Sequence, residues 1–146
     1  MAGNAATMAA DDYRLGDQIG FILRKANQRH TAIFARMMIG ELTPTQWAVL
    51  VTLADQGPLS QNLLGRETAM DGATIKGVVD RLLKRGLLTA TPDREDGRRS
   101  LIDLATDGRA LVEAGRPVAA AITEQTLAGL DRQQRKTLLS LLDAIS

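Results

Sequence analysis

The strongest constraint on the fold is an amphipathic stretch at residues 69–88, AMDGATIKGVVDRLLKRGLL. Apolar side chains recur along it at helical spacing: Ile75, Val78, Val79, Leu82 and Leu83. The opposite face is small and basic and carries Ala73, Lys76, Gly77, Asp80, Arg81 and Lys84. A glycine on a solvated helix face costs roughly 1 kcal/mol relative to alanine. A surface that is kept both small and basic therefore needs a reason beyond helix formation.

Start signals predict further helices before this one. A long helix is expected over residues 11–39. In the next helix Thr43 is the N-cap residue, Pro44 occupies the first helical position and Gln46 can complete a capping box. Ser60 is expected to cap a short third helix. The amphipathic helix is thus the fourth along the chain.

After the amphipathic helix the periodicity changes. Asp71 is its expected N-cap residue and Gly86 ends it. The strand-like runs LLTATP and RSLIDLA then flank the polar loop DREDGR, which predicts a hairpin. Helices resume after Thr106, with a break or kink expected near Pro117, and Asp131 caps the last one. The predicted fold is mainly α with a small β-hairpin, in the order of a winged helix-turn-helix.

In such a module the basic helix enters the major groove of double-stranded DNA, where a bulky first turn would collide with the bases. Small residues allow the close approach, while Thr74 and Lys76 can reach base edges or phosphates. The predicted recognition set is Gly72, Ala73, Thr74, Lys76, Gly77 and Arg81. An alternative is that Gly77 only permits a close crossing with another helix. The amphipathic stretch alone leaves both interpretations open.

The hairpin tip adds a second predicted DNA contact, because a hairpin that follows a recognition helix lies against the flanking minor groove. Asp96 stands two residues before Arg98, a spacing that suits a carboxylate orienting a guanidinium for insertion. Arg94 and Arg99 are expected to meet phosphates. The predicted wing residues are therefore Arg94, Asp96, Arg98 and Arg99.

Composition limits the other possibilities. The chain has 146 residues, 45% of them hydrophobic, which suits one domain with a proper core. Its net charge is only +1, yet residues 76–99 hold seven Lys or Arg against four Asp or Glu, so a polyanion site must be local. The N-terminus lacks the regions of a signal peptide and no apolar run approaches a membrane span, so we expect a cytoplasmic protein without membrane contact.

The sequence offers little for catalysis. It has one histidine, no cysteine and no glycine-rich phosphate loop. A catalytic triad, a nucleotide cradle and a cysteine-ligated metal site therefore have no residues to build on. We expect no enzyme, no cofactor and no metal. The rival to DNA binding is a winged-helix protein-interaction module, in which the basic helix meets an acidic partner and DNA is never read.

Three segments resemble the MarR (multiple antibiotic resistance regulator) family of transcription factors: LTPTQWAVLVTLAD, SQNLLGRETAMDGATIKGVVDRLLKRGLL and the wing DREDGRRSLIDLATDGRALV. The resemblance spans roughly residues 11–145. It implies a homodimer on a palindromic operator, usually a repressor, that a small phenolic or aromatic carboxylate effector releases from DNA. Glu95 departs from the pattern, since many family wings carry arginine there.

The resemblance also divides the chain. Residues 43–105 form the winged helix-turn-helix, residues 11–39 and 107–146 supply dimerisation helices, and residues 1–10 are expected to be a disordered tail. The C-terminal pattern supports this division, because it offers more apolar surface than one terminal helix can bury against itself. The residues expected to pack on the first helix of a second chain are Leu138, Leu139, Leu141, Leu142 and Ile145.

The sequence identifies the effector site less clearly than the DNA-binding site. His30 lies on or beside the apolar stripe of the first helix and can hydrogen-bond a carboxylate or phenol, while Trp47 can stack on a ring. Phe34 and Met37 complete the candidate ligand set. The alternative is packing, since a lone histidine on an apolar helix face, like a Phe or Met at helical spacing, is more often part of a core.

Overall fold

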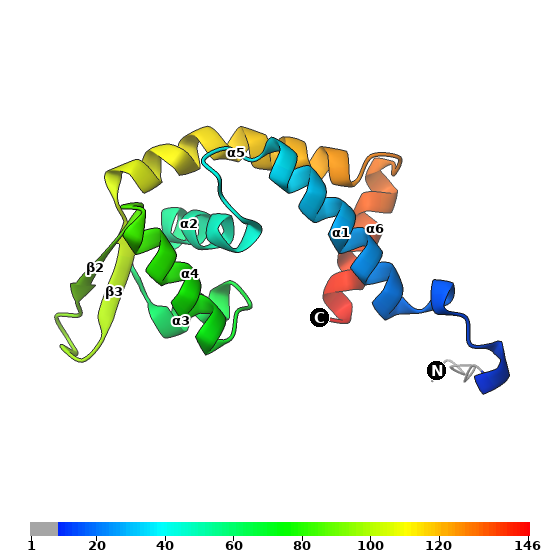
Figure 1. Ribbon diagram of the computed structural model, residues 1–146, viewed down its shortest axis with the longest axis horizontal. Helices are drawn as coiled ribbons and strands as arrows, with labels where there is room; N and C mark the ends of the chain where they lie inside the picture. Colours follow the sequence, from blue (N-terminus) through cyan, green and yellow to red (C-terminus); the bar gives the residue numbers. More distant parts are fainter. Residues whose placement is uncertain (1–8) are drawn as a thin grey trace.

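The computed structural model describes residues 9–146, and Figure 1 shows a mainly helical molecule with a small sheet at one end. Two short 3-10 helices, η1 (Ala10–Asp12) and η2 (Leu15–Asp17), precede the first α-helix. The α-helices are α1 (Ile19–Met37), α2 (Pro44–Gln56), α3 (Gln61–Glu67), α4 (Gly72–Lys84), α5 (Thr106–Thr126) and α6 (Arg132–Ala144). The strands are β1 (Leu59–Ser60), β2 (Leu88–Pro92) and β3 (Ser100–Leu104), in the antiparallel order β1-β3-β2.

The predicted N-caps of four helices are confirmed. The Thr43 hydroxyl accepts the backbone N–H of Gln46 and forms the expected capping box of α2. Ser60, Asp71 and Asp131 cap α3, α4 and α6 in the same way. Each cap satisfies a backbone donor that has no partner inside its helix, so short polar residues fix where these helices begin.

The main core lies inside the winged helix-turn-helix, between α2, α3, α4, the sheet and the start of α5. Val49, Leu50 and Leu53 of α2 are buried there against Leu64 of α3. Four of the five stripe residues of α4 are buried in the same core, and Leu83 packs at its edge. The helical period predicted for residues 69–88 is therefore confirmed, and it turns the small basic face outward.

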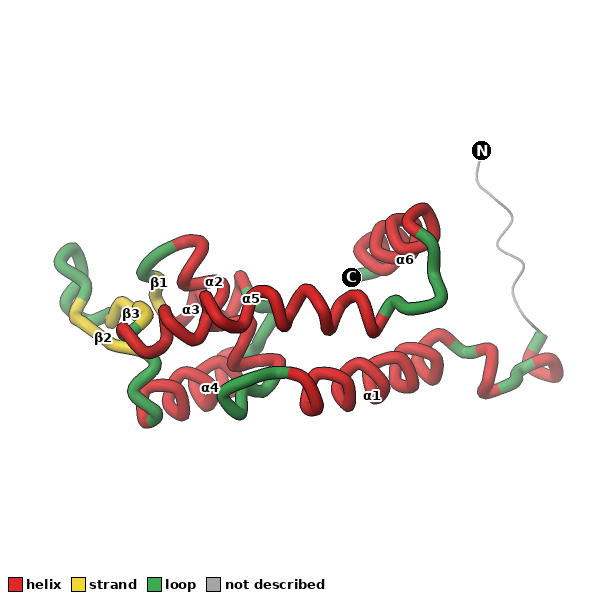
Figure 2. The backbone as a smooth tube through the Cα atoms, turned by 90° about the horizontal axis from the view of Figure 1, so that it is seen from above, coloured by secondary structure: helices red, strands yellow, loops and turns green. Residues whose placement is uncertain are grey.

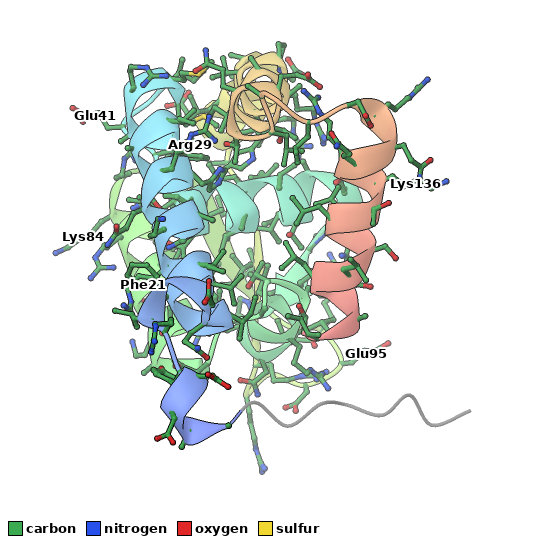
Figure 3. The ribbon with its side chains drawn as sticks, turned by 90° about the vertical axis from the view of Figure 1, so that its right-hand side faces the viewer. Phe21, Arg29, Glu41, Lys84, Glu95 and Lys136 are labelled. Atoms are coloured by element: carbon green, nitrogen blue, oxygen red, sulfur yellow. The ribbon has the colours of Figure 1, made fainter. Side chains whose placement is uncertain are left out.

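Figure 1 also shows α5 running from the sheet to the far end of the molecule, where α1 and α6 lie. Seen from above in Figure 2, α1 extends along the second half of α5. A second, smaller core there contains Ile33, Phe34 and Ile122. Among the described residues, none of α6 is buried. In Figure 3, α1 and α6 lie on opposite sides of the view, below the end of α5.

Several boundaries differ from the expectation. The long first helix begins at Ile19 instead of Asp11, because the chain before it forms two 3-10 turns and Gln18 is extended. The expected tail at residues 1–10 lies outside the described residues except for its last two, and Ala10 begins η1. The helix α5 is not broken at Pro117 but continues through it. Pro117 is exposed, so water can satisfy the carbonyl that its ring leaves without a donor.

The hairpin is confirmed, with Leu88 opposite Leu104 and Pro92 opposite Ser100. The third strand was not predicted, since a two-residue strand is too short to show an alternating pattern. Ser60 pairs with Leu101 and so serves both as strand end and as helix cap. This pairing fixes the base of the wing beside the start of α3.

No helix among residues 9–146 has the length and apolarity needed to cross a bilayer.

Candidate nucleic-acid interface

The outward face of α4 is open at its glycines. A Cβ atom added at Gly72 would find no described atom within 4 Å, and one added at Gly77 would meet only the Arg81 guanidinium, at 3.7 Å. No other element of the described chain comes within 4 Å of a Cβ atom added at either glycine. Within the described chain, no helix therefore crosses α4 closely at Gly77. The space beside these glycines is free for a ligand outside the chain.

The basic and polar residues of this face are exposed, as the predicted site requires. Ala73, Thr74 and Arg81 all lie on the surface. Lys76 is paired with Asp80 at 2.8 Å, and both side chains are more than half exposed. An exposed pair of this kind contributes at most about 1 kcal/mol, so a phosphate can replace the carboxylate at little cost.

The first turn of α4 is firmly held. The Asp71 carboxylate accepts the backbone N–H of Thr74 at 2.7 Å. This hydrogen bond holds the pKa of Asp71 below its ordinary value, so the capping group stays ionised at neutral pH. The residues that follow the cap are thus presented in a fixed helical geometry.

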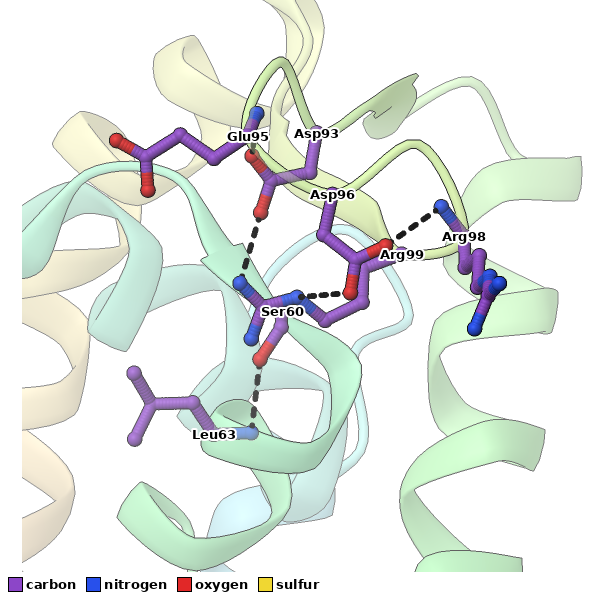
Figure 4. A network of polar contacts seen from close by, with 7 residues as sticks. All are labelled: Ser60, Leu63, Asp93, Glu95, Asp96, Arg98 and Arg99. Carbon is purple, nitrogen blue, oxygen red and sulfur yellow. Dashed lines mark hydrogen bonds and ion pairs between the residues drawn. The ribbon is translucent and has the colours of Figure 1, made fainter.

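The wing differs from the prediction in how its charges pair. Asp96 does not hold the guanidinium of Arg98, because its Oδ1 atom accepts the backbone N–H of Arg98 instead, at 3.0 Å (Figure 4). Its other oxygen faces Arg99, with Oδ2 at 3.8 Å from Nε. The predicted Asp96–Arg98 side-chain pair is therefore wrong. The loop folds so that the side chain of Arg99, not that of Arg98, faces the Asp96 carboxylate.

Arg99 is also not a free side chain. Its Nη2 atom donates to Asp93 Oδ2 at 3.1 Å. By contrast, Arg94 and Arg98 form no ion pair with any residue in 9–146. In Figure 4 the guanidinium of Arg98 points away from the carboxylates of the loop. The wing therefore offers two unpaired arginines and one arginine used internally.

A further group of polar residues, which the sequence pattern did not single out, lies on α3 beside this face. Asn62 and Arg66 line a depression together with Gly72 at the start of α4. Gln61 and Asn62 also line a hollow shared with Arg99 at the base of the wing. These polar residues lie between the base of the wing and the start of α4. The sequence could have indicated them, because Leu63 and Leu64 mark the buried side of α3 and place its polar residues on the outer side.

Three of the four candidate ligand residues come together around the second core. Phe34 is buried there, and Met37 and Trp47 pack against it. The indole of Trp47 covers Gly115 of α5 so closely that a Cβ atom there would lie 2.5 Å from Cζ3. These three residues therefore serve packing in this structure, which favours the alternative given for Phe34 and Met37.

His30 is in a different position. Its Nδ1 atom lies 2.9 Å from the Thr126 hydroxyl, and its ring centroid lies 6.2 Å from that of Phe34. The half-buried ring also lines a pocket of about 430 Å³ between α1, the end of α5 and α6. Leucines form most of the walls, and Asn27, Arg29 and Thr126 add polar groups.

Among residues 9–146 no cluster of His, Asp and Glu suits a metal ion.

Comparison with known proteins identifies the family of this fold. Residues 41–99 match the model of the MarR family. The HTH-type transcriptional repressor NicR of Pseudomonas putida is 40% identical over 140 residues, which cover 95% of this chain and 89% of that protein.

Two solved structures are similar over almost the whole chain. A probable transcriptional regulator from Pseudomonas aeruginosa is 56% identical, with a TM-score of 0.89, and the match covers 91% of this chain and all of that one. Bordetella bronchiseptica BpsR, whose DNA binding is regulated by 6-hydroxynicotinic acid, is 42% identical, with a TM-score of 0.87 over 91% of this chain and 96% of that one. The chain belongs to the MarR family of transcriptional regulators.

Proposed function

We propose that this protein is a cytoplasmic, homodimeric transcriptional repressor that binds a palindromic DNA operator and leaves it when a small aromatic acid or phenol binds. It acts through binding alone and catalyses no reaction. The observation that carries the proposal is the open face of α4, where Gly72 and Gly77 have free space beside exposed basic side chains. NicR, a repressor, and BpsR, a regulated DNA-binding protein, support the same class of function.

DNA recognition follows from this face and from the wing. With α4 in the major groove, the glycines let the helix backbone approach the base edges, which Thr74, Lys76 and Arg81 can then reach. Arg98 extends into the minor groove beside it, where a narrow groove concentrates negative potential. Arg94 meets phosphates of the backbone. A net charge of only +1 is sufficient, because the positive charge is concentrated where the DNA lies.

The proposed dimer uses the end of the molecule away from the wing. Large apolar side chains are exposed there, including Leu15 of η2, Ile19 of α1, Leu141 of α6 and Ile145 just after α6. Ile145 has 65% of its surface exposed in the single chain, and a patch of such residues marks an interaction site. A two-fold axis through this end would give two symmetry-related α4 helices, which is the geometry that a palindromic site requires.

The proposed effector pocket is the one that His30 lines. Its volume of about 430 Å³ falls within the range of small-molecule sites, and its leucine walls suit an aromatic ring. Three of these leucines, Leu138, Leu139 and Leu142, are also among the residues expected at the dimer contact, so the pocket adjoins the proposed interface. The imidazole and the Thr126 hydroxyl can bond a carboxylate or phenol at one side. The regulation of BpsR by 6-hydroxynicotinic acid supports an aromatic acid as the class of effector.

Replacing Gly77 by leucine tests the open face of α4. Because a Cβ at this position meets only Arg81, and leucine is the better helix former, the unfolding free energy should hold or rise by up to about 1 kcal/mol. DNA affinity should nevertheless fall by at least about tenfold, since the side chain would occupy the groove. Ala110→Leu, at an exposed position of α5, controls for an added surface leucine. Unchanged operator affinity in Gly77→Leu, measured by fluorescence anisotropy, would place the glycine elsewhere.

The double variant Leu141→Glu with Ile145→Glu tests the dimer. Both side chains are exposed in the single chain, so its helices should form normally. The dimer dissociation constant should rise by at least about a hundredfold, because an unpaired charge buried in an interface costs about 3 kcal/mol or more. Ala110→Glu, at an exposed position near the start of α5 and away from this end of the molecule, should leave the dimer intact. Sedimentation velocity gives the answer, and a double variant that stays as dimeric as the parent contradicts the interface.

The effector proposal is tested with 6-hydroxynicotinic acid as the probe. The compound should release the parent protein from DNA, and His30→Ala should weaken this response by about tenfold or more through the lost hydrogen bond. Thr126→Val removes only the hydroxyl partner of His30 and separates the ring's own role from that bond. If His30→Ala lowers the melting temperature but responds to the compound like the parent, His30 is a packing residue.

A further inference from the structure

The wing contains a polar network that the DNA contacts alone do not explain. Asp93 is the most enclosed member, because only 12% of its side-chain surface is exposed, against 48% for Asp96. One of its oxygens accepts the backbone N–H of Glu95 at 2.9 Å, and the other accepts from Arg99 at 3.1 Å. The backbone N–H of Asp93 also donates to the carbonyl of Arg99 at 2.9 Å. These bonds close the loop across its base.

A second carboxylate completes the network from the other side of the loop. Asp96 faces Arg99 with one oxygen and accepts the backbone N–H of Arg98 with the other (Figure 4). The backbone N–H of Arg99 donates to the carbonyl of Asp96 at 3.0 Å. One guanidinium therefore stands between two carboxylates, and both also fix backbone donors of the tip.

The network is attached to the rigid part of the module. Arg99 directly precedes β3, whose Leu101 pairs with Ser60 at the start of α3. The Arg99 side chain shares a hollow with Ser60 and Asn62, so it lies between the wing tip and the helix-turn-helix. A bond from the tip to Arg99 thus sets the direction of the tip relative to α3 and α4.

We propose that Arg99, held by Asp93 and Asp96, is a positioning residue that fixes the wing so that Arg94 and Arg98 meet DNA in a preformed geometry. The inference rests on the proposed function, since it assigns a role within the same DNA interface. A loop ordered before binding does not lose its freedom on binding, and this raises affinity without adding a contact. The carboxylates face an approaching polyanion, so their presence is understandable only if the ordering outweighs their repulsion.

If Asp93 positions the wing, removing it should weaken DNA binding, whereas removing the nearby carboxylate of Glu95 should not. Glu95→Ala and Asp93→Ala each remove one negative charge from the same loop, but the Glu95 side chain is exposed and takes part in no ion pair among residues 9–146. Charge alone predicts that both variants bind DNA more tightly than the parent. We expect Glu95→Ala to bind as tightly as the parent or more so. Asp93→Ala should bind about tenfold more weakly, because the tip is no longer held.

Two further measurements separate positioning from a direct contact by Arg99. In the free protein, amide hydrogen exchange at residues 94–98 should accelerate in Asp93→Ala and in Arg99→Ala, but not in Glu95→Ala. In DNA titrations, Asp93→Ala should have a smaller salt dependence than the parent despite its lost negative charge, since Arg98 no longer reaches its contact. If Arg99 were instead a phosphate contact, freeing it by Asp93→Ala would strengthen binding and steepen that dependence.

The outcomes distinguish this inference from the proposed function. If the parent binds DNA and Asp93→Ala behaves like Glu95→Ala in affinity and exchange, the positioning role is overturned while the proposed function stands. If neither the parent nor Glu95→Ala binds any duplex, the proposed function fails and the positioning role fails with it. Weaker binding and faster exchange confined to Asp93→Ala and Arg99→Ala support it.

Discussion

The burial of four side chains of α4, Ile75, Val78, Val79 and Leu82, decides what the rest of the module can present to a ligand. Each is at most 4% exposed, and burying such a side chain is worth about 1.5–3 kcal/mol relative to leaving it in water. The helix therefore cannot rotate without losing several of these contributions. Because α4 is fixed in this way, its small face points outward, and a Cβ atom at Gly77 would meet only the Arg81 guanidinium.

The charges of the interface are arranged around this fixed helix. Asp93 stays ionised, since the backbone N–H of Glu95 and the charge of Arg99 hold its pKa below the ordinary value. Arg99 is thereby used within the wing itself, whereas Arg94 and Arg98 are left to contact a partner. The positive potential that results is local and directional, which suits a groove better than a uniformly basic surface.

The sequence predicted the parts that depend on local rules. Helical period identified the buried side of α4, and the N-cap at Asp71 followed from short-range hydrogen bonding. The partner of Asp96 could not be predicted in this way, because Arg98 and Arg99 are both near it in the chain and only the folded loop selects between them. For Phe34, only the folded structure shows that the side chain is buried in the second core, since helical spacing cannot distinguish a core position from a ligand wall.

The central claim is that α4 and the wing together bind the grooves of DNA, and the salt dependence of binding tests it most directly. For the parent protein, the logarithm of the binding constant should fall linearly and steeply with the logarithm of salt concentration. Arg98→Ala should weaken binding by about 1–3 kcal/mol and reduce the slope by about one unit for each arginine lost. Equal slopes and affinities for the two proteins would contradict the account and favour a winged-helix module that binds another protein.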